Sequence, residues 1–464
     1  MVRHCHRRGK DGSRHPPPAP DAGTEHGFRH GEQPCRRGEF VTARRVVITG
    51  IGLITALGEG ASATWSALVA GRTAVGPLRA YDPSPLRTRL GAEIPDFDPA
   101  EFLSLRSMRT STRGDQYGVA AATLALRDAG LEQRDLGPRT GLYLGGNKDI
   151  CQRDDSIADM AAIRGADGAP DMRRLGELAR SIVPPLAYVE GLQNGGTYHI
   201  SSLFGLRGPN AFYAGAADSG ATAIGRAMRA IRRGEADIAV AGGYDDATNW
   251  WAMAKLDGLG VLSPRNDLDT KAFRPFDRDH SGSVIGDGAA ILVLEDRDRA
   301  LRRGAHCYAE LAGYGMGNDC VRAPASDPDG RGLARAIAAS LSDADAAAPD
   351  CVLSHGCATA LGDTSEVRAL RSALGLNAEQ AAVTSVKPQT GHLVGGAGAL
   401  NAAFAALALN SGVVPGTANH ETPAPGCDLD IVAGAARDAR PRVALALARG
   451  LEGQAVALTL TRSN

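Results

Sequence analysis

Apolar residues change their spacing several times along the chain, and each change marks an expected element. Residues 44–52 (RRVVITGIG) form a β-branched run that ends in glycines, which predicts a buried strand leading into a tight turn. Residues 117–129 are Ala-rich with apolar side chains at helical spacing, and Gly130 follows as a stop signal, so we expect a helix there. The short apolar run at residues 141–146 predicts the next strand. This alternation of strand and helix favours a largely parallel sheet.

The same order returns in the rest of the chain. Helical spacing over residues 219–233 ends at Gly234, and a buried strand is expected over residues 237–243. Further elements follow as strands at 289–294 and 351–354 and helices at 330–342 and 397–409. We interpret the repetition as an internal duplication.

Residues 1–43 have a different composition from the rest of the chain. They are rich in Arg, His, Pro and Gly and show hardly any apolar periodicity, which predicts a disordered extension. His4, Cys5 and His6 carry side chains that bind metals, but without a fold to fix their geometry a solvated tail is the better interpretation. Val41 is a candidate start of translation, in which case most of this segment would not be made.

Composition excludes several classes of function. The 464 residues include 51 basic and 52 acidic side chains and no basic stripe with interleaved aromatics, so nucleic acid is not an expected partner. The longest apolar runs, such as residues 402–409, are far short of the roughly 18 to 20 residues that span a bilayer, and no signal peptide opens the chain. Eight cysteines at irregular spacing without a CxxC pair argue against a zinc site and a disulfide framework. We expect a soluble cytoplasmic protein without a metal.

Four segments in a fixed order carry a family resemblance. They are GPNAFYAGAADSGATAIG (208–225), SHGCATALGDTSE (354–366), VKPQTGHLVGGAGALN (386–401) and GLEGQAVALTL (450–460). Together they resemble the β-ketoacyl-[acyl-carrier-protein] synthases of the thiolase-like superfamily, and the resemblance covers nearly the whole chain after the tail. It implies an α/β fold in which two duplicated βα lobes, residues 44–295 and 296–464, form a layered αβαβα architecture.

The resemblance places an alanine at the family's nucleophile position. Family members attack an acyl thioester with a cysteine at the start of a helix, where the helix dipole and free N–H groups favour the thiolate. Here that position is Ala217, with the register set by the Ser219-Gly220 pair. A methyl group cannot form an acyl-enzyme, so we expect no condensation by this chain alone. Asp218 leaves the helix about 100° around from Ala217, and we expect it to stabilise the helix start rather than to act as a nucleophile.

At three other catalytic positions implied by the resemblance, this chain has the residue that the family has. His355 and His392 match the two histidines that hold the thioester carbonyl and stabilise the enolate formed when malonyl loses carbon dioxide. Lys387, one of five lysines in the chain, matches the family's active-site lysine. Its usual acidic partner is replaced by Asn401, so we expect the charge partner of Lys387 to be lost.

Positions that bind the substrate arm have also changed. Two family threonines hydrogen-bond the phosphopantetheine of the acyl carrier protein, and they correspond here to Cys357 and Thr359. We interpret Cys357 as an ordinary buried thiol, because we expect no helix start beside it. The family's gate sequence Gly-Phe-Gly-Gly is Gly-Leu-Glu-Gly here, with Leu451 in the gate position, and Glu452 in place of glycine predicts another path for this loop. The resemblance implies no cofactor bound by the chain itself, since the carrier protein brings the phosphopantetheine.

Three functions fit these residues. The favoured one is a non-condensing subunit resembling the chain length factor of type II polyketide synthases, catalytic only within a heterodimer with a cysteine-bearing ketosynthase. Residues 194–209 resemble the family's dimer interface, although their apolar pattern also fits an ordinary core helix. The alternatives are a decarboxylase of malonyl-acyl carrier protein that supplies a primer, and a purely structural module that binds carrier protein and ketosynthase. A polyketide and a fatty acid are both open as products.

Overall fold

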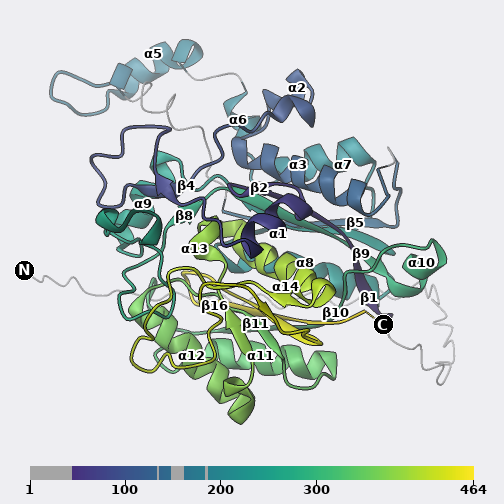
Figure 1. Ribbon diagram of the computed structural model, residues 1–464. Coiled ribbons are helices and arrows are strands. Elements are labelled where there is room, and N and C mark those ends of the chain that lie inside the picture. The colour runs from purple at the N-terminus through teal and green to yellow at the C-terminus, as the bar shows by residue number, and fades with distance from the viewer. Residues whose placement is uncertain (1–43, 133–134, 148–160, 183–185, 464) are drawn as a thin grey trace, which may run out of the picture. The chain divides into compact units, whose positions relative to one another are not determined.

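The structure is a computed structural model that describes residues 44–463, apart from residues 133–134, 148–160 and 183–185 (Figure 1). The part of the chain from residue 43 onward forms one compact unit. The expectations for residues 1–43, including those for His4, Cys5 and His6, concern residues outside the described range.

Five strands of the first half form a mixed sheet in the order β6-β5-β7-β9-β1. They are β1 (Val46–Thr55), β5 (Thr140–Gly146), β6 (Asn210–Ala214), β7 (Ile238–Asp245) and β9 (Gly288–Asp296). β5 is parallel to β6 and β7, whereas β9 is antiparallel to β7 and β1. The sheet is therefore not largely parallel as the alternation of elements suggested, because the segment between β7 and β9 returns to the end of the sheet at which β7 finishes.

The second half repeats this arrangement strand for strand, in the order β12-β11-β15-β16-β10. Its strands are β10 (Ala309–Asn318), β11 (Cys351–Leu353), β12 (Ala382–Thr384), β15 (Val443–Arg449) and β16 (Gln454–Thr461). β11 is parallel to β12 and β15, and β16 is antiparallel to β15 and β10. Numbered along the chain, both halves have the strand order 3-2-4-5-1. The predicted duplication is confirmed, and antiparallel pairing of β1 with β10 joins the halves.

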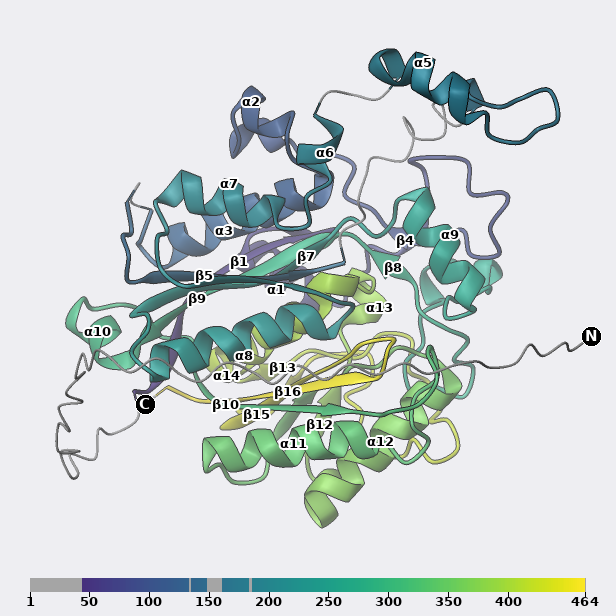
Figure 2. The same cartoon turned by 180° about the vertical axis from the view of Figure 1, so that it is seen from behind.

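Helices complete five layers (Figures 1 and 2). α3 (Arg113–Asp128) covers the outer face of the first sheet, and α11 (Arg331–Ala344) with α12 (Ala360–Leu374) covers that of the second. α8 (Asp218–Arg232) and α14 (Ala397–Ser411) lie side by side between the sheets. This is the expected αβαβα architecture. Residues 394–411 are long and apolar enough to cross a bilayer, but 89% of this stretch is buried, as suits a helix packed between two sheets.

Shorter elements connect this frame. The strands are β2 (Gly58–Glu59), β3 (Gly76–Pro77), β4 (Leu90–Ala92), β8 (Ile285–Gly286), β13 (Val413–Val414) and β14 (Arg437–Asp438). The helices are α1 (Ala61–Val69), α2 (Leu105–Met108), α5 (Met172–Ile182), α6 (Ala187–Glu190), α7 (Gly195–Phe204), α9 (Trp250–Leu259), α10 (Arg297–Arg302) and α13 (Lys387–Thr390). Those that matter for the site are α7, α9 and α13.

The glycines of β1 do not end the strand as predicted. β1 runs through them to Thr55. A Cβ atom on Gly52 would lie 1.8 Å from the carbonyl oxygen of Ala121 in α3, closer than any real contact. These glycines therefore let α3 pack directly on the strand. A glycine in a sequence can mark either a turn or such a close contact, and the sequence pattern alone does not distinguish the two.

α3 begins four residues before its predicted start. Thr112 accepts the backbone N–H of Asp115 with its hydroxyl, and the Asp115 carboxylate accepts the backbone N–H of Thr112. This reciprocal capping satisfies two N–H groups that the first turn leaves open. Polar residues 113–116 thus belong to the helix although they lack apolar periodicity.

Candidate functional site

One pocket gathers six of the seven residues that the sequence singled out. Its lining includes Ala217, His355, Cys357, Thr359, His392 and Leu451. The remaining wall consists of Ala216, Leu256, Val261, Leu262, Ser283, Ile285, Pro324, Ser326, Val394, Arg449 and Gly450. The seventh predicted residue, Lys387, lies behind His355 rather than in the pocket surface. Residues from both halves of the chain therefore meet at one place.

Ala217 stands immediately before α8, as its N-cap residue. Its side chain is 1% exposed and belongs to the central apolar cluster. The first N–H groups of a helix have no partner within the helix, so this position suits a developing negative charge. The electrostatic setting for an anionic nucleophile is present, whereas the side chain offers only a methyl group.

The two histidines face the pocket with the same ring nitrogen protonated. Their ring centroids are 5.5 Å apart, at an interplanar angle of 83°. Nδ1 of His355 accepts the backbone N–H of Arg449 at 3.4 Å, and Nδ1 of His392 accepts that of Val394 at 3.1 Å. In a neutral imidazole the other nitrogen then carries the proton. Each ring is thus left with an Nε2–H to donate to a bound oxygen.

Burial keeps both imidazoles neutral. Desolvation lowers the pKa of His392 to about 3, and the positive charge of Lys387 adds to the effect. Desolvation likewise lowers the pKa of His355 well below its ordinary value, with Lys387, His392 and Arg449 acting in the same direction. At neutral pH both rings are therefore uncharged, and each can donate one hydrogen bond from Nε2 into the pocket.

Lys387 retains a carboxylate neighbour, contrary to the expectation from Asn401. Burial lowers the pKa of Lys387 to about 8, and the charge of Glu366 on α12 acts in the opposite direction. The lysine Nζ donates to the carbonyl oxygen of His355 at 2.5 Å. Glu366 in turn accepts the backbone N–H of His355 at 2.7 Å and that of Gly356 at 2.8 Å. The acid therefore comes from the helix after His355, which the sequence pattern did not reveal.

Asn401 has a structural role in α14. Its side-chain amide donates to the carbonyl oxygens of Ser354 at 2.9 Å and Leu447 at 2.8 Å. These carbonyls follow β11 and lie in β15, so the amide ties the central helix to two parallel strands of the second sheet. An amide can donate in this way and an ionised carboxylate cannot.

Cys357 lies close to a helix start, which corrects another expectation. Thr359 caps α12 by accepting the N–H of Gly362 with its hydroxyl, and the helix begins at Ala360. Even so, burial raises the pKa of the Cys357 thiol to about 11, and the charge of Asp363 adds to the rise. Desolvation outweighs the helix dipole here. At neutral pH Cys357 is a thiol and a weak nucleophile.

The segment in the gate position is a tight turn between β15 and β16. The N–H of Gly450 donates to Gln454 O at 2.8 Å, and that of Gly453 donates to Gly450 O at 3.2 Å. Leu451 points into the pocket wall and Glu452 is exposed. Gly453 has a φ of 93°, a conformation that favours glycine.

Asp218 packs against this turn. A Cβ atom on Gly450 would lie 2.5 Å from Asp218 Oδ1 and 2.8 Å from Gln454 Oε1, so only glycine fits beside them. Neither of these two oxygens has a hydrogen-bond partner within the described residues. Burial, with the charge of Glu452 acting in the same direction, raises the pKa of Asp218 to about 6. The start of α8 thus has an acidic neighbourhood beside the methyl group of Ala217.

Sequence reasoning missed Arg449 and Asp319. Arg449 ends β15 and lines the pocket, and its side chain forms an ion pair with Asp319 at 2.6 Å. A single charge at the end of the apolar strand VALALAR was the available signal. The partner could not be inferred, because the two residues are 130 positions apart.

Fold and site together define a thiolase-like protein, with duplicated lobes and a pocket at the start of a central helix. The chain matches the family described as "Beta-ketoacyl synthase, N-terminal domain" over residues 43–300. It also matches "Beta-ketoacyl synthase, C-terminal domain" over residues 308–421. This chain therefore belongs to the β-ketoacyl synthase family.

Individual relatives agree with this assignment. The chain is 34% identical over 426 residues to 3-oxoacyl-[acyl-carrier-protein] synthase 2 of Coxiella burnetii, covering 90% of this chain and 99% of that one. A solved structure named "The ishigamide ketosynthase/chain length factor" is similar with a TM-score of 0.80 and 32% identity, over 91% of this chain and 100% of the other. A second, "AntDE:AntF (apo): type II PKS acyl-carrier protein in complex with its ketosynthase bound to the hexaketide", has a TM-score of 0.81 and 26% identity with the same coverage. The family is that of fatty acid and type II polyketide synthesis.

Proposed function

We propose that this chain is the non-condensing partner of a cysteine-bearing ketosynthase, of the chain-length-factor type, in the synthesis of a polyketide or fatty acid. The observation that carries the proposal is the pocket at the start of α8, where His355 and His392 are kept and the nucleophile position holds the methyl group of Ala217. Condensation by the family's route requires a covalent acyl intermediate. Cys357 does not replace the nucleophile, because burial raises its pKa to about 11. The subunit then depends on a partner for bond formation.

The edge of the first sheet supports a partner of the same fold. β6 pairs only with β5 among the described strands, so its other side presents unpaired backbone groups. Its residues Phe212 and Tyr213 are half-buried, and three positions separate its end from Ala217. Edge pairing with an equivalent strand would build one sheet across two subunits and bring the two pockets near each other.

α7, which lies in the stretch expected at the interface, has both a core face and a free face. Ile200 and Phe204 are buried against the first half, whereas Tyr198 is 67% exposed and Leu203 is 41% exposed. The core face fits the interpretation of residues 194–209 as a core helix, and the interface interpretation stays a prediction. The free face extends the proposed interface beside β6.

The carrier protein is the second proposed partner. In the AntDE:AntF structure, a type II PKS acyl-carrier protein is in complex with its ketosynthase. We expect the same class of partner here, with the phosphopantetheine arm reaching Thr359 at the pocket wall. The site of action would be the cytoplasm.

Coexpression with a cysteine-bearing ketosynthase tests the proposal. We expect a stable heterodimer by size-exclusion chromatography with light scattering, and condensing activity only in the heterodimer. Phe212→Lys on the β6 edge should abolish the heterodimer, because it places a charge at the paired edge. Leu376→Lys, at a position that is 85% exposed in the second half, is the matched control and should leave it intact. Recovery of only separate monomers and homodimers would contradict the proposal.

A second function, decarboxylation of malonyl-acyl carrier protein, is favoured by the tautomer of the histidine pair. Two neutral Nε2–H donors can bind the thioester oxygen as charge develops on it. The bond between the carboxylate carbon and the α-carbon breaks, carbon dioxide leaves, and the enolate takes a proton from water to give an acetyl thioester. No cysteine is needed. The purified chain should release carbon dioxide from malonyl-carrier protein faster than His392→Ala does, and equal rates would eliminate this function.

A further inference from the structure

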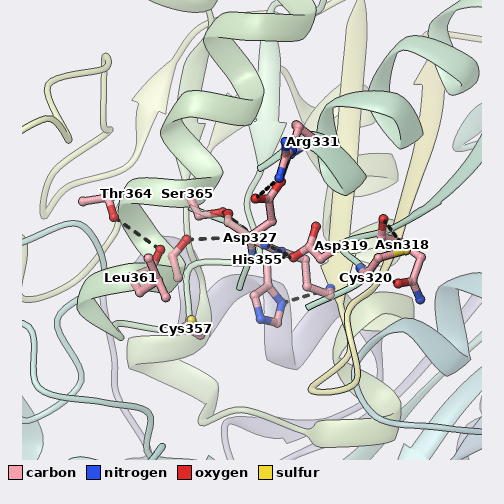
Figure 3. Close-up of polar contacts among 12 residues, drawn as sticks. Asn318, Asp319, Cys320, Asp327, Arg331, His355, Cys357, Leu361, Thr364 and Ser365 are labelled. Atoms are coloured by element: carbon pink, nitrogen blue, oxygen red, sulfur yellow. Dashed lines mark hydrogen bonds and ion pairs between the residues drawn. The ribbon is translucent and has the colours of Figure 1, made fainter. Parts of the chain in front are cut away.

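Arg449 is a buried cation at which three segments of the chain meet. Its Nη2 lies 2.6 Å from Asp319 Oδ2, and the two side chains are only 5% and 2% exposed. Both of its terminal nitrogens lie 3.2 Å from the hydroxyl oxygen of Ser365 on α12. Figure 3 shows Asp319, Ser365 and His355 close to one another. The guanidinium therefore bonds both to the segment after β10 and to α12 in the outer helix layer.

These contacts close into a ring. Asp319 Oδ2 also accepts the N–H of Asp327 at 3.1 Å, and the Ser365 hydroxyl donates to the carbonyl oxygen of Asp327 at 2.6 Å. Following the bonds leads from Arg449 to Asp319, to Asp327, to Ser365 and back to Arg449. Figure 3 shows Asp319, Asp327 and Ser365 with their dashed contacts. Removing one member breaks the ring in two places, so the ring holds its segments together more firmly than one ion pair would.

Two of the joined segments form the wall of the pocket. The 319–327 segment supplies Pro324 and Ser326, and the turn after Arg449 supplies Gly450 and Leu451. A backbone bond of 2.8 Å from the N–H of Asp319 to Gly453 O connects the same two segments directly. The ion pair thus lies where these two parts of the wall would have to separate if the wall opened.

Arg449 also acts on His355 from two sides. Its backbone N–H donates to Nδ1 of the ring, which leaves the proton on Nε2. Its guanidinium holds Ser365, the neighbour of Glu366, whose carboxylate accepts the backbone N–H of His355. The orientation of the ring therefore depends on the strand end and on the helix that Arg449 connects.

We propose that Arg449 is a positioning residue: through its ion pair with Asp319 it closes the pocket wall, and by fixing the end of β15 it keeps the main-chain N–H of residue 449 on Nδ1 of His355, which holds the Nε2–H tautomer. The inference goes beyond the proposed function and does not depend on it, since wall closure and tautomer are properties of the purified chain. It predicts that entry of a molecule past this wall requires a buried ion pair to open.

Cys357 is a natural reporter of wall closure, because its thiol lines the pocket. The experiment compares the wild-type chain with Arg449→Met, with the double variant Arg449→Met/Asp319→Asn, and with Arg449→Lys. Arg232→Met is the matched control, since Arg232 pairs with Asp343 at 3.1 Å in another part of the chain. A maleimide on a pantetheine-length linker is added at fixed pH, and labelling of the Cys357 peptide is followed by mass spectrometry.

We expect labelling of Cys357 to be at least about tenfold faster in Arg449→Met and in the double variant, intermediate in Arg449→Lys, and unchanged in Arg232→Met. The double variant removes both charges, so it should regain the stability that the single variant loses. Faster labelling of Cys357 in a double variant of wild-type stability would therefore report an open wall and not a less stable fold. If Arg449→Met fails to fold, the double variant and Arg449→Lys still decide the question.

Long-range proton–nitrogen spectra of ¹⁵N-histidine-labelled protein give the second measurement. The signals of the His355 ring should change from the pure Nε2–H pattern toward a mixture in the double variant, while the signals of His392 stay unchanged. A double variant that folds with wild-type labelling of Cys357 and a wild-type His355 tautomer would overturn the proposal, because the ion pair would then neither close the wall nor position the ring.

Discussion

The two sides of the pocket differ in how their polar groups are satisfied. On the histidine side, Glu366, Lys387 and the two rings each have a hydrogen-bond partner, and Glu366 and Lys387 both bond to the main chain of His355. On the side of α8, Ala217 has no functional group, and Asp218 Oδ1 lacks a hydrogen-bond partner in the described structure. In a buried polar network, the loss of one member leaves its partners without a hydrogen bond, which is costly in a low-dielectric interior. The histidine side can therefore donate hydrogen bonds into the pocket, whereas the start of α8 presents a methyl group and a carboxylate oxygen without a hydrogen-bond partner among the described residues.

The largest expected effect comes from breaking the histidine side at Glu366. Glu366→Leu removes the acceptor of two backbone N–H groups and leaves Lys387 without its neighbouring carboxylate. Leaving an uncompensated buried charge costs about 3–5 kcal/mol. We expect the free energy of unfolding in urea to fall by that amount. Glu379→Leu, an exposed acid that pairs with Arg371, is the control and should cost well under about 1 kcal/mol.

The α8 side should respond in the opposite direction. Because the folded-state pKa of Asp218 is about 6 and an unperturbed aspartate has a pKa of about 3.9, the folded chain binds more protons between these values. Its contribution to stability is then present below about pH 4 and is lost as the pH rises through about 6. Asp218→Asn should therefore stabilise the protein by about 3 kcal/mol at pH 8 and change little at pH 4. Urea unfolding at the two pH values measures this difference.

An Asp218→Asn variant that is equally destabilised at pH 4 and pH 8 would show that the carboxyl is held by bonds rather than penalised by burial. The description of the α8 side as the side with an unsatisfied, destabilising carboxylate would then be wrong. Glu452→Gln gives an independent check, since removing that charge should lower the pKa of Asp218 toward its ordinary value.

Restoring the nucleophile alone should not restore an active site. In Ala217→Cys the start of α8 favours a thiolate, but Asp218 and Glu452 disfavour it. Adding Asp218→Asn and Glu452→Gln should lower the pKa of the introduced thiol by about one unit, which is about 1.4 kcal/mol. The pH dependence of alkylation by iodoacetamide, followed on the peptide that contains residue 217, measures it. Identical pKa values in the two backgrounds would mean that the acids do not act on this position.

Sequence alone predicted the elements whose pattern is local. The helix expected at 219–233 is α8, Asp218–Arg232, and the one expected at 397–409 is α14, Ala397–Ser411. Six of the seven candidate site residues meet in one pocket, because the family resemblance fixed their positions relative to strand ends. The roles assigned to them remain predictions.

What could not be predicted depends on contacts between distant segments. The antiparallel direction of β9 follows from where the chain returns to the sheet, and apolar runs carry no information about direction. The carboxylate beside Lys387 comes from Glu366 on α12 and not from position 401, where the Asn401 amide instead donates to the carbonyl oxygen of Ser354. Neither fact leaves a pattern in the sequence.

The smallest expected effect concerns Leu451, which lines the pocket beside Gly450. If the pocket measures the product within a heterodimer, Leu451→Ala should lengthen the product and Leu451→Phe should shorten it, each by one or two extension units, with the overall rate nearly unchanged. Leu376→Ala, at an exposed position away from the pocket, should leave the product distribution as it is. Mass spectrometry of the products made by the reconstituted pair decides this. Unaltered lengths in both Leu451 variants would favour a purely structural module, because a wall that contacts no product cannot select its length.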